Sequence, residues 1–224
     1  MADQHNDNIP ALANQVAEDI PDIKENLEFH KDCFQQICTG WNNTSVAALG
    51  FIRTIWVPAV MMETNATAAA ATGTNERSTN KINIEHWAFD GASEEIVEFD
   101  LVMPEGWNRG TIKAKFYWSS ATSSTDGDTV EWEIAAGALS DNDAIDAALG
   151  TSQVITDTLL ANDGGDLQVT AATPALTVGG TPALGDLIHF KVSRNVGGTD
   201  DMEEDAWLFG VLIQITETNT IAAW

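Results

Sequence analysis

Few side chains in this sequence have the types and spacing that catalysis requires. The four histidines, His5, His30, His86 and His189, form no closely spaced metal-binding pair. The glycine patterns of nucleotide-binding loops and the serine elbow of hydrolases are missing too. Glu131 and Glu133 share one strand face, as the paired carboxylates of glycosidases can, but such a face is more simply solvated. The sequence therefore predicts no catalytic residues and no cofactor.

The densest acidic run lies at residues 197–205. Oxygen-rich loops of this kind can hold Ca²⁺, and Asp200, Asp201 and Glu203 are the candidate ligands. The spacing of a helix-loop-helix calcium loop is absent, so a solvated loop is the alternative. We expect no metal here.

Tryptophan is the other residue type with binding chemistry, and there are eight. Trp118, Trp132 and Trp207 fall among large apolar residues in expected strands, which predicts core positions. The other group, at strand edges or turns, is Trp56, Trp87 and Trp107. If exposed, these rings would either stack on sugar rings or fill a subunit interface, and the heptad described next favours the interface.

Apolar residues near the amino end repeat at alternating intervals of three and four. The repeat consists of Ile20, Ile23, Leu27, His30, Phe34 and Ile37. This spacing predicts a helix that packs against copies of itself, and isoleucine at these positions favours a coiled coil of three or more helices. The expected organisation is an extended arm at 1–19, a trimerisation helix at 20–41, a linker at 42–54 and a β domain at 55–224.

The remainder of the chain reads as β-structure. A first strand is expected at residues 54–62, where Pro58 confines it to a sheet edge or a bulge. Alternating apolar and polar residues predict further strands near 81–89, 94–103, 111–118, 129–135, 153–160, 167–172, 187–194 and 206–216. The last is the most apolar and is expected to be central, whereas residues 141–149 read as a short helical insert. Long connections argue against an up-and-down barrel. We therefore expect an all-β, antiparallel, jelly-roll-like sandwich preceded by the coiled-coil helix.

Charge and cysteine content narrow the partners. The net charge of −24 disfavours binding to nucleic acid or to anionic membrane surfaces. Cys33 and Cys38 are the only cysteines, and they form no disulfide framework. The first residues lack a secretory signal, and no apolar run reaches a membrane-spanning length. A soluble protein made in a cytoplasm is expected.

Several short strings resemble virion surface proteins of tailed bacteriophages. They are Phe89-Asp90-Gly91-Ala92-Ser93-Glu94-Glu95, Phe99 with Met103-Pro104-Glu105, Lys115-Phe116-Tyr117-Trp118-Ser119, Val130-Glu131-Trp132, Gly185-Asp186 with Ile188, and Val192-Ser193-Arg194 followed by Thr199-Asp200-Asp201. The similarity covers roughly residues 80–220. It extends to head-decoration, head-spike and fibre-type proteins and to gene transfer agent head spikes.

This resemblance implies a homotrimer of jelly-roll domains on the virion surface. Residues 1–19 would anchor the trimer to the major capsid protein or another virion protein, after synthesis in the host cytoplasm. The resemblance carries over no functional residues. The alternative is a carbohydrate-binding or host-attachment module on the same trimeric scaffold, with a host-surface glycan as partner.

Overall fold

The described part of the chain folds as antiparallel β-structure. The computed structural model describes residues 50–122, 124–160 and 165–218. These ranges contain eleven strands and one short 3₁₀ helix, η1 (Ala59–Met61), but no α-helix. Among these same residues, no helix is long and apolar enough to cross a membrane.

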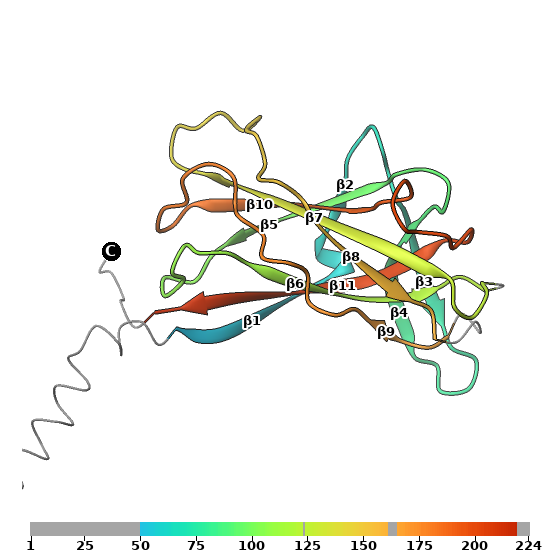
Figure 1. Ribbon diagram of the computed structural model, residues 1–224. Coiled ribbons are helices and arrows are strands. Elements are labelled where there is room, and N and C mark those ends of the chain that lie inside the picture. Colours follow the sequence, from blue (N-terminus) through green and yellow to red (C-terminus); the bar gives the residue numbers. More distant parts are fainter. Residues whose placement is uncertain (1–49, 123, 161–164, 219–224) are drawn as a thin grey trace, which may run out of the picture. The chain divides into compact units, whose positions relative to one another are not determined.

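The strands form two sheets that lie face to face (Figure 1). Sheet A has the order β3-β4-β11-β6-β9, with β1 also pairing to β11, and sheet B has the order β2-β5-β10-β7-β8. The strands of sheet A are β1 (Phe51–Pro58), β3 (Ala71–Glu76), β4 (Asn83–Phe89), β6 (Lys113–Ser120), β9 (Gln168–Val169) and β11 (Ala206–Glu217). Those of sheet B are β2 (Glu63–Thr64), β5 (Ile96–Val102), β7 (Thr129–Leu139), β8 (Gln153–Thr158) and β10 (Leu187–Arg194).

From β4 onward the chain passes repeatedly between the sheets, and only β7 and β8 follow one another within a sheet. Four strands of each sheet therefore take the orders β4-β11-β6-β9 and β5-β10-β7-β8. Strands wound between two sheets in this way form a jelly roll. The predicted antiparallel jelly-roll sandwich is confirmed, and so is the central place of the last strand, which pairs with β1, β4 and β6.

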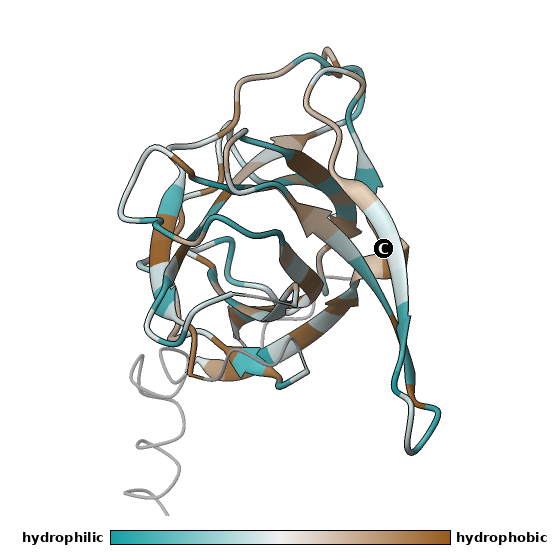
Figure 2. Ribbon diagram, turned by 90° about the vertical axis from the view of Figure 1, so that its right-hand side faces the viewer, coloured by the Kyte–Doolittle hydropathy of each residue, from teal (hydrophilic) through white to brown (hydrophobic). Residues whose placement is uncertain are grey.

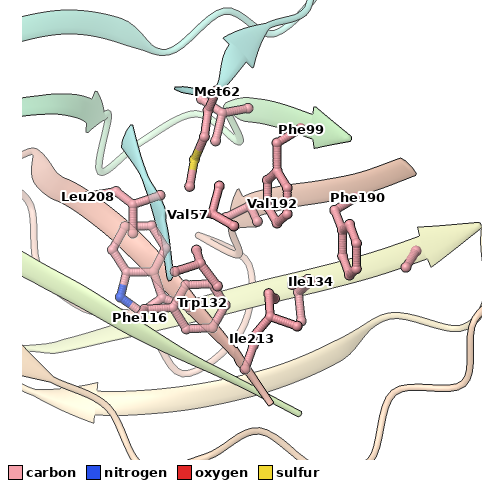
Figure 3. Packing of buried hydrophobic residues seen from close by; sticks show 14 of the residues in the cluster. Val57, Met62, Phe99, Phe116, Trp132, Ile134, Phe190, Val192, Leu208 and Ile213 are labelled. Carbon is pink, nitrogen blue, oxygen red and sulfur yellow. The ribbon is translucent and has the colours of Figure 1, made fainter. Parts of the chain in front are cut away.

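One hydrophobic core fills the space between the sheets. Hydrophilic and hydrophobic residues alternate along the strands, because successive side chains point to opposite faces (Figure 2). Trp132 is fully buried in this core, and its ring lies 5.5 Å from Phe116 and 5.2 Å from Phe89. Phe99 and Phe190 stack with ring centres 4.8 Å apart (Figure 3). The inward faces predicted for β5, β6 and β7 are therefore confirmed.

Two local predictions are wrong. Residues 141–149 form turns and bends instead of a helix, and Ile145 is 88% exposed. A helix of this length is unstable without an apolar contact to hold it. The first strand begins at Phe51, inside the segment expected to be a linker, because residues 51–58 pair with β11 along their whole length. The arm and helix expected at residues 1–41 lie outside the described residues.

Candidate functional site

The solvent-facing side of sheet A carries a row of aromatic side chains. Because β11 packs Ala206 and Leu208 into the core, Trp207 and Phe209 face outward. The same alternation on β1, β4 and β6 supplies further outward rings. We call this row the aromatic band, and it consists of His86, Trp207, Phe209, Tyr117 and Trp56.

One half of the band is built on β4 and β11. The imidazole of His86 stacks on Trp207 with ring centres 4.6 Å apart, and Phe209 meets it edge-on at 6.3 Å. Gly73 on β3 lies opposite His86, and a Cβ there would come within 2.5 Å of the histidine Nε2. Glycine at position 73 thus leaves the space that the imidazole occupies.

The other half depends on an irregularity in β11. The pairing register between β11 and β6 shifts between Leu208 and Gly210, so Phe209 is an extra residue in the strand. The ring of Trp56 crosses Gly210 and meets Tyr117 at 4.9 Å, at an angle of 78°. A Cβ at position 210 would lie 2.5 Å from the Trp56 ring. The bulge and the glycine together therefore allow the two halves to lie side by side.

The band is partly recessed and has polar neighbours. A cavity of about 190 Å³ lies over Trp207 and Phe209, between Ile84 of β4 and Leu167 beside β9. Next to Trp56, the register aligns Lys113, Gln214 and Thr54 across β6, β11 and β1. We call the band and this cavity the aromatic groove. It combines ring faces with amide, hydroxyl and ammonium groups that can form hydrogen bonds.

The outer face of sheet B has a different character. His189 lies 2.8 Å from the carboxylate of Asp100 and 4.0 Å from that of Glu98, and Lys191 pairs with Glu94 at 3.7 Å. The outer face of sheet B is therefore polar and charged around His189. Exposed aromatic rings are thus concentrated on sheet A among the described residues.

The titration of His86 should affect stability. Burial lowers the pKa of His86, and the Ile84 backbone opposes this shift only in part. A histidine with a lowered folded pKa takes up protons more readily when unfolded, so stability falls as pH drops below the unfolded value of about 6.5. Urea unfolding at pH 7.5 and 5.0 should therefore show a larger loss for the wild type than for His86→Phe, which keeps an aromatic ring. Equal losses in both proteins would contradict this prediction.

Of the three tryptophans predicted as surface binding residues, the structure leaves one exposed. Trp56 is 45% exposed and belongs to the aromatic band. Trp87 is 9% exposed because it points into the core, where its Nε1 donates to the Ala59 carbonyl at 2.9 Å. Trp107 is 5% exposed beneath a turn whose backbone bonds to the end of β11. The surface role expected for these last two is thus corrected.

The acidic residues proposed as weak ion ligands are engaged within the protein. Asp200 forms a two-pronged pair with Arg194, through contacts of 2.8 Å and 2.7 Å. Asp201 accepts hydrogen bonds from the backbone and hydroxyl of Thr129, and the backbone bond is the main reason that its pKa is lowered. The segment that carries Asp200 and Asp201 is therefore fastened to the sandwich. Among the described residues no group of three or more potential ligands is placed to hold a metal, and Glu203 belongs to none.

Glu131, one of the two carboxylates considered for catalysis, is only 6% exposed, which corrects the solvated position expected for it. It accepts hydrogen bonds from Asn195, Thr156 and Thr199. Burial raises the pKa of Glu131, but these hydrogen bonds outweigh burial and hold the pKa below its ordinary value. The side chain fixes the loop after β10 to β7, which is a structural role.

The residues predicted to trimerise lie outside the described part of the chain. They are Ile20, Ile23, Leu27, His30, Phe34 and Ile37. Their association therefore stays a prediction.

Sequence reasoning missed most of the aromatic band. Trp207 was expected in the core, whereas its ring lies on the outer face against His86. The signal was the run Ala206-Trp207-Leu208-Phe209, which is apolar at every position and so must place some large residues outward. A half-exposed sheet normally alternates apolar with polar residues, so this run indicated an apolar outer surface.

Comparison with known proteins gives weak similarities. No protein-family model matches the chain, and no curated protein matches it. A family 11 carbohydrate-binding module from Clostridium thermocellum, solved with a mixed-linked tetrasaccharide, is 11% identical with a TM-score of 0.37, over 73% of this chain and 95% of that one. A family 28 module specific for non-crystalline cellulose is 11% identical with a TM-score of 0.38, over 70% of this chain and 87% of that one. A mannan-binding family 27 module is 8% identical with a TM-score of 0.38, over 73% and 98%. No ligand is carried over from similarities this low.

Proposed function

We propose that the β domain is a non-catalytic binding module whose aromatic groove binds a neutral glycan. The observation that carries the proposal is the row of aromatic rings on a face that the sandwich does not cover. Aromatic rings on an exposed sheet face leave apolar area in water, and such patches mark binding surfaces. Trp56, at 45% exposed, is the most accessible ring of the band.

The chemistry of the groove favours a sugar chain over other polymers. A pyranose ring has an apolar face of C–H groups and a rim of hydroxyls, so it can stack on Trp56 or Trp207 and bond to Gln214 or Thr54. Nucleic-acid bases also stack on aromatic rings, but a net charge of −24 repels their phosphates. The same charge disfavours sulfated and other acidic glycans. Neutral glycans can stack on the rings and form hydrogen bonds, and the negative charge of the protein does not repel them.

The cavity over Trp207 and Phe209 supports a polymeric ligand of which the protein contacts only a few residues. Its volume of about 190 Å³ is below the range of about 300–1,000 Å³ that is typical for whole small-molecule ligands. One sugar residue would occupy the cavity, and its neighbours would extend along the band toward Trp56. The groove would thus recognise a few consecutive residues of an oligosaccharide.

A glycan microarray with neutral and sulfated glycans tests this function. We expect the full-length protein to be retained on a subset of neutral oligosaccharides and to leave sulfated glycans and double-stranded DNA unbound. Retention should depend little on salt, because stacking and neutral hydrogen bonds are not screened as phosphate contacts are. An array without any neutral binder, or binding confined to sulfated glycans, would contradict the proposal.

A second proposal is that the module is displayed as a homotrimer on a virion surface. It rests on the heptad at residues 20–37 and on the phage resemblance, and one structural feature favours it. Phe51 and Ile52, at the start of β1, are 56% and 63% exposed, which suits burial between copies of the chain. Light scattering of the full-length protein should give the mass of three chains, and a monomer would contradict this role. A trimeric virion protein that binds a glycan on the host surface would fulfil both proposals.

A further inference from the structure

A second cavity lies where the β3–β4 hairpin meets η1. Its volume is about 450 Å³, which is within the range of small-molecule sites. The hairpin supplies one wall, and η1 with the residue after it supplies the other. The residues that matter for its chemistry are Val60, Met62, Thr72, Thr74, Glu85 and His86.

His86 belongs to both this cavity and the aromatic groove. Its ring stacks on Trp207 on the outer face of sheet A, whereas Thr74 and Glu85, at alternate positions of the hairpin, point to the opposite face, toward the cavity. The side chain is 7% exposed, because Trp207 and Phe209 pack against its ring. His86 therefore lies between the cavity and the aromatic groove, and the two spaces are separate.

The two walls of the cavity differ in polarity. Val60 and Met62 form an apolar side. Thr72 and Thr74 bring hydroxyls, and Glu85 brings a carboxylate that accepts hydrogen bonds and repels anions. A ligand that fits has one apolar face and several hydroxyl donors, and it carries no negative charge.

We infer that this cavity binds a single neutral sugar residue, with Glu85 and Thr74 as hydrogen-bond partners and Met62 against the apolar face of the ring. The inference rests on the proposed glycan-binding function and adds a separate subsite on the other side of His86. The groove takes residues along a sugar chain, whereas the cavity takes one terminal or branching residue. The module is then selective for glycans that present such a residue.

The methionines provide a direct readout. Met62 is 4% exposed and lines the cavity, while the neighbouring Met61 is 68% exposed and lies outside it. In the full-length protein labelled with ¹³C-methyl methionine, titration with D-glucose, D-galactose and D-mannose should shift the Met62 signal with at least one sugar and leave Met61 in place. Glu85→Gln and Thr74→Val should each weaken this titration about tenfold, the effect of losing one good hydrogen bond. Glu76→Gln, on the same hairpin outside the cavity, should leave it unchanged.

Tryptophan signals recorded in parallel separate this inference from the proposed function. If an oligosaccharide from the array shifts 5-fluorotryptophan signals of Trp56 and Trp207 while no sugar moves Met62, the cavity subsite is overturned and the groove stands. If neither the tryptophans nor Met62 respond, both are overturned. A Met62 shift that persists in Glu85→Gln and Thr74→Val with unchanged affinity also overturns the subsite.

Discussion

Replacement of Arg194 by methionine should lower the free energy of unfolding by about 3–5 kcal/mol, because it leaves a buried carboxylate without its partner. Arg194 is fully buried, and the Asp200 side chain is only 1% exposed. The guanidinium also donates to the carbonyls of Phe89, Glu204 and Met202. Methionine preserves most of the volume but satisfies none of these acceptors. Urea unfolding followed by fluorescence measures the loss.

The surface pair between Arg53 and Glu217 offers a matched control. Its atoms lie 2.9 Å apart, against 2.7 Å in the buried pair, but the Arg53 side chain is 53% exposed. Arg53→Met should therefore cost about 0–1 kcal/mol. If both variants lost the same free energy, the structural role assigned to Arg194 would be wrong. The acidic segment after β10 would then need another anchor.

Replacement of Trp56 or Trp207 by alanine should reduce glycan affinity by roughly thirtyfold each, which corresponds to the loss of about 2 kcal/mol at an aromatic contact that dominates binding. The fold should survive Trp56→Ala, because this ring lies half in solvent and its main contact is Tyr117. Trp207 contacts His86 on the outer face, so its removal leaves the core intact. Isothermal titration with an oligosaccharide from the array gives the two affinities.

Val154→Ala is the matched control for these variants. Val154 is 41% exposed and lies on the edge strand β8 of sheet B, whereas the aromatic band is on sheet A. The substitution shortens an exposed apolar side chain, as the tryptophan variants do, and should leave glycan affinity unchanged. Equal affinity of the wild type and both tryptophan variants would place the glycan outside the aromatic groove.

The fold was predictable because most strands are buried on one face. Val97, Phe99 and Leu101 alternate with Glu98 and Asp100, and this period of two specifies both the strand and its inward face. The pattern fails where neighbouring segments bury an outward residue. Glu131 was expected in solvent, but the loop after β10 folds over it, which no local pattern reveals.

The candidate site was much less predictable. Trp56 was identified from its type and its place at a strand edge. The stacking of His86 on Trp207 joins residues 121 positions apart and requires a glycine at position 73, and the other half of the band requires a bulge in β11. Periodicity on one strand contains no information about either. Trp87 and Trp107 were expected at the surface but are buried, Trp87 because it is on the inward face of β4 and Trp107 because its turn folds over the core.

The aromatic groove as a glycan site is tested most directly by fluorine NMR of protein labelled with 5-fluorotryptophan. On addition of an oligosaccharide from the array, the signals of Trp56 and Trp207 should shift together, with one affinity that agrees with calorimetry. The signals of Trp118 and Trp132, both fully buried in the core, should stay in place. Saturable glycan binding that leaves Trp56 and Trp207 unchanged would contradict the proposed site.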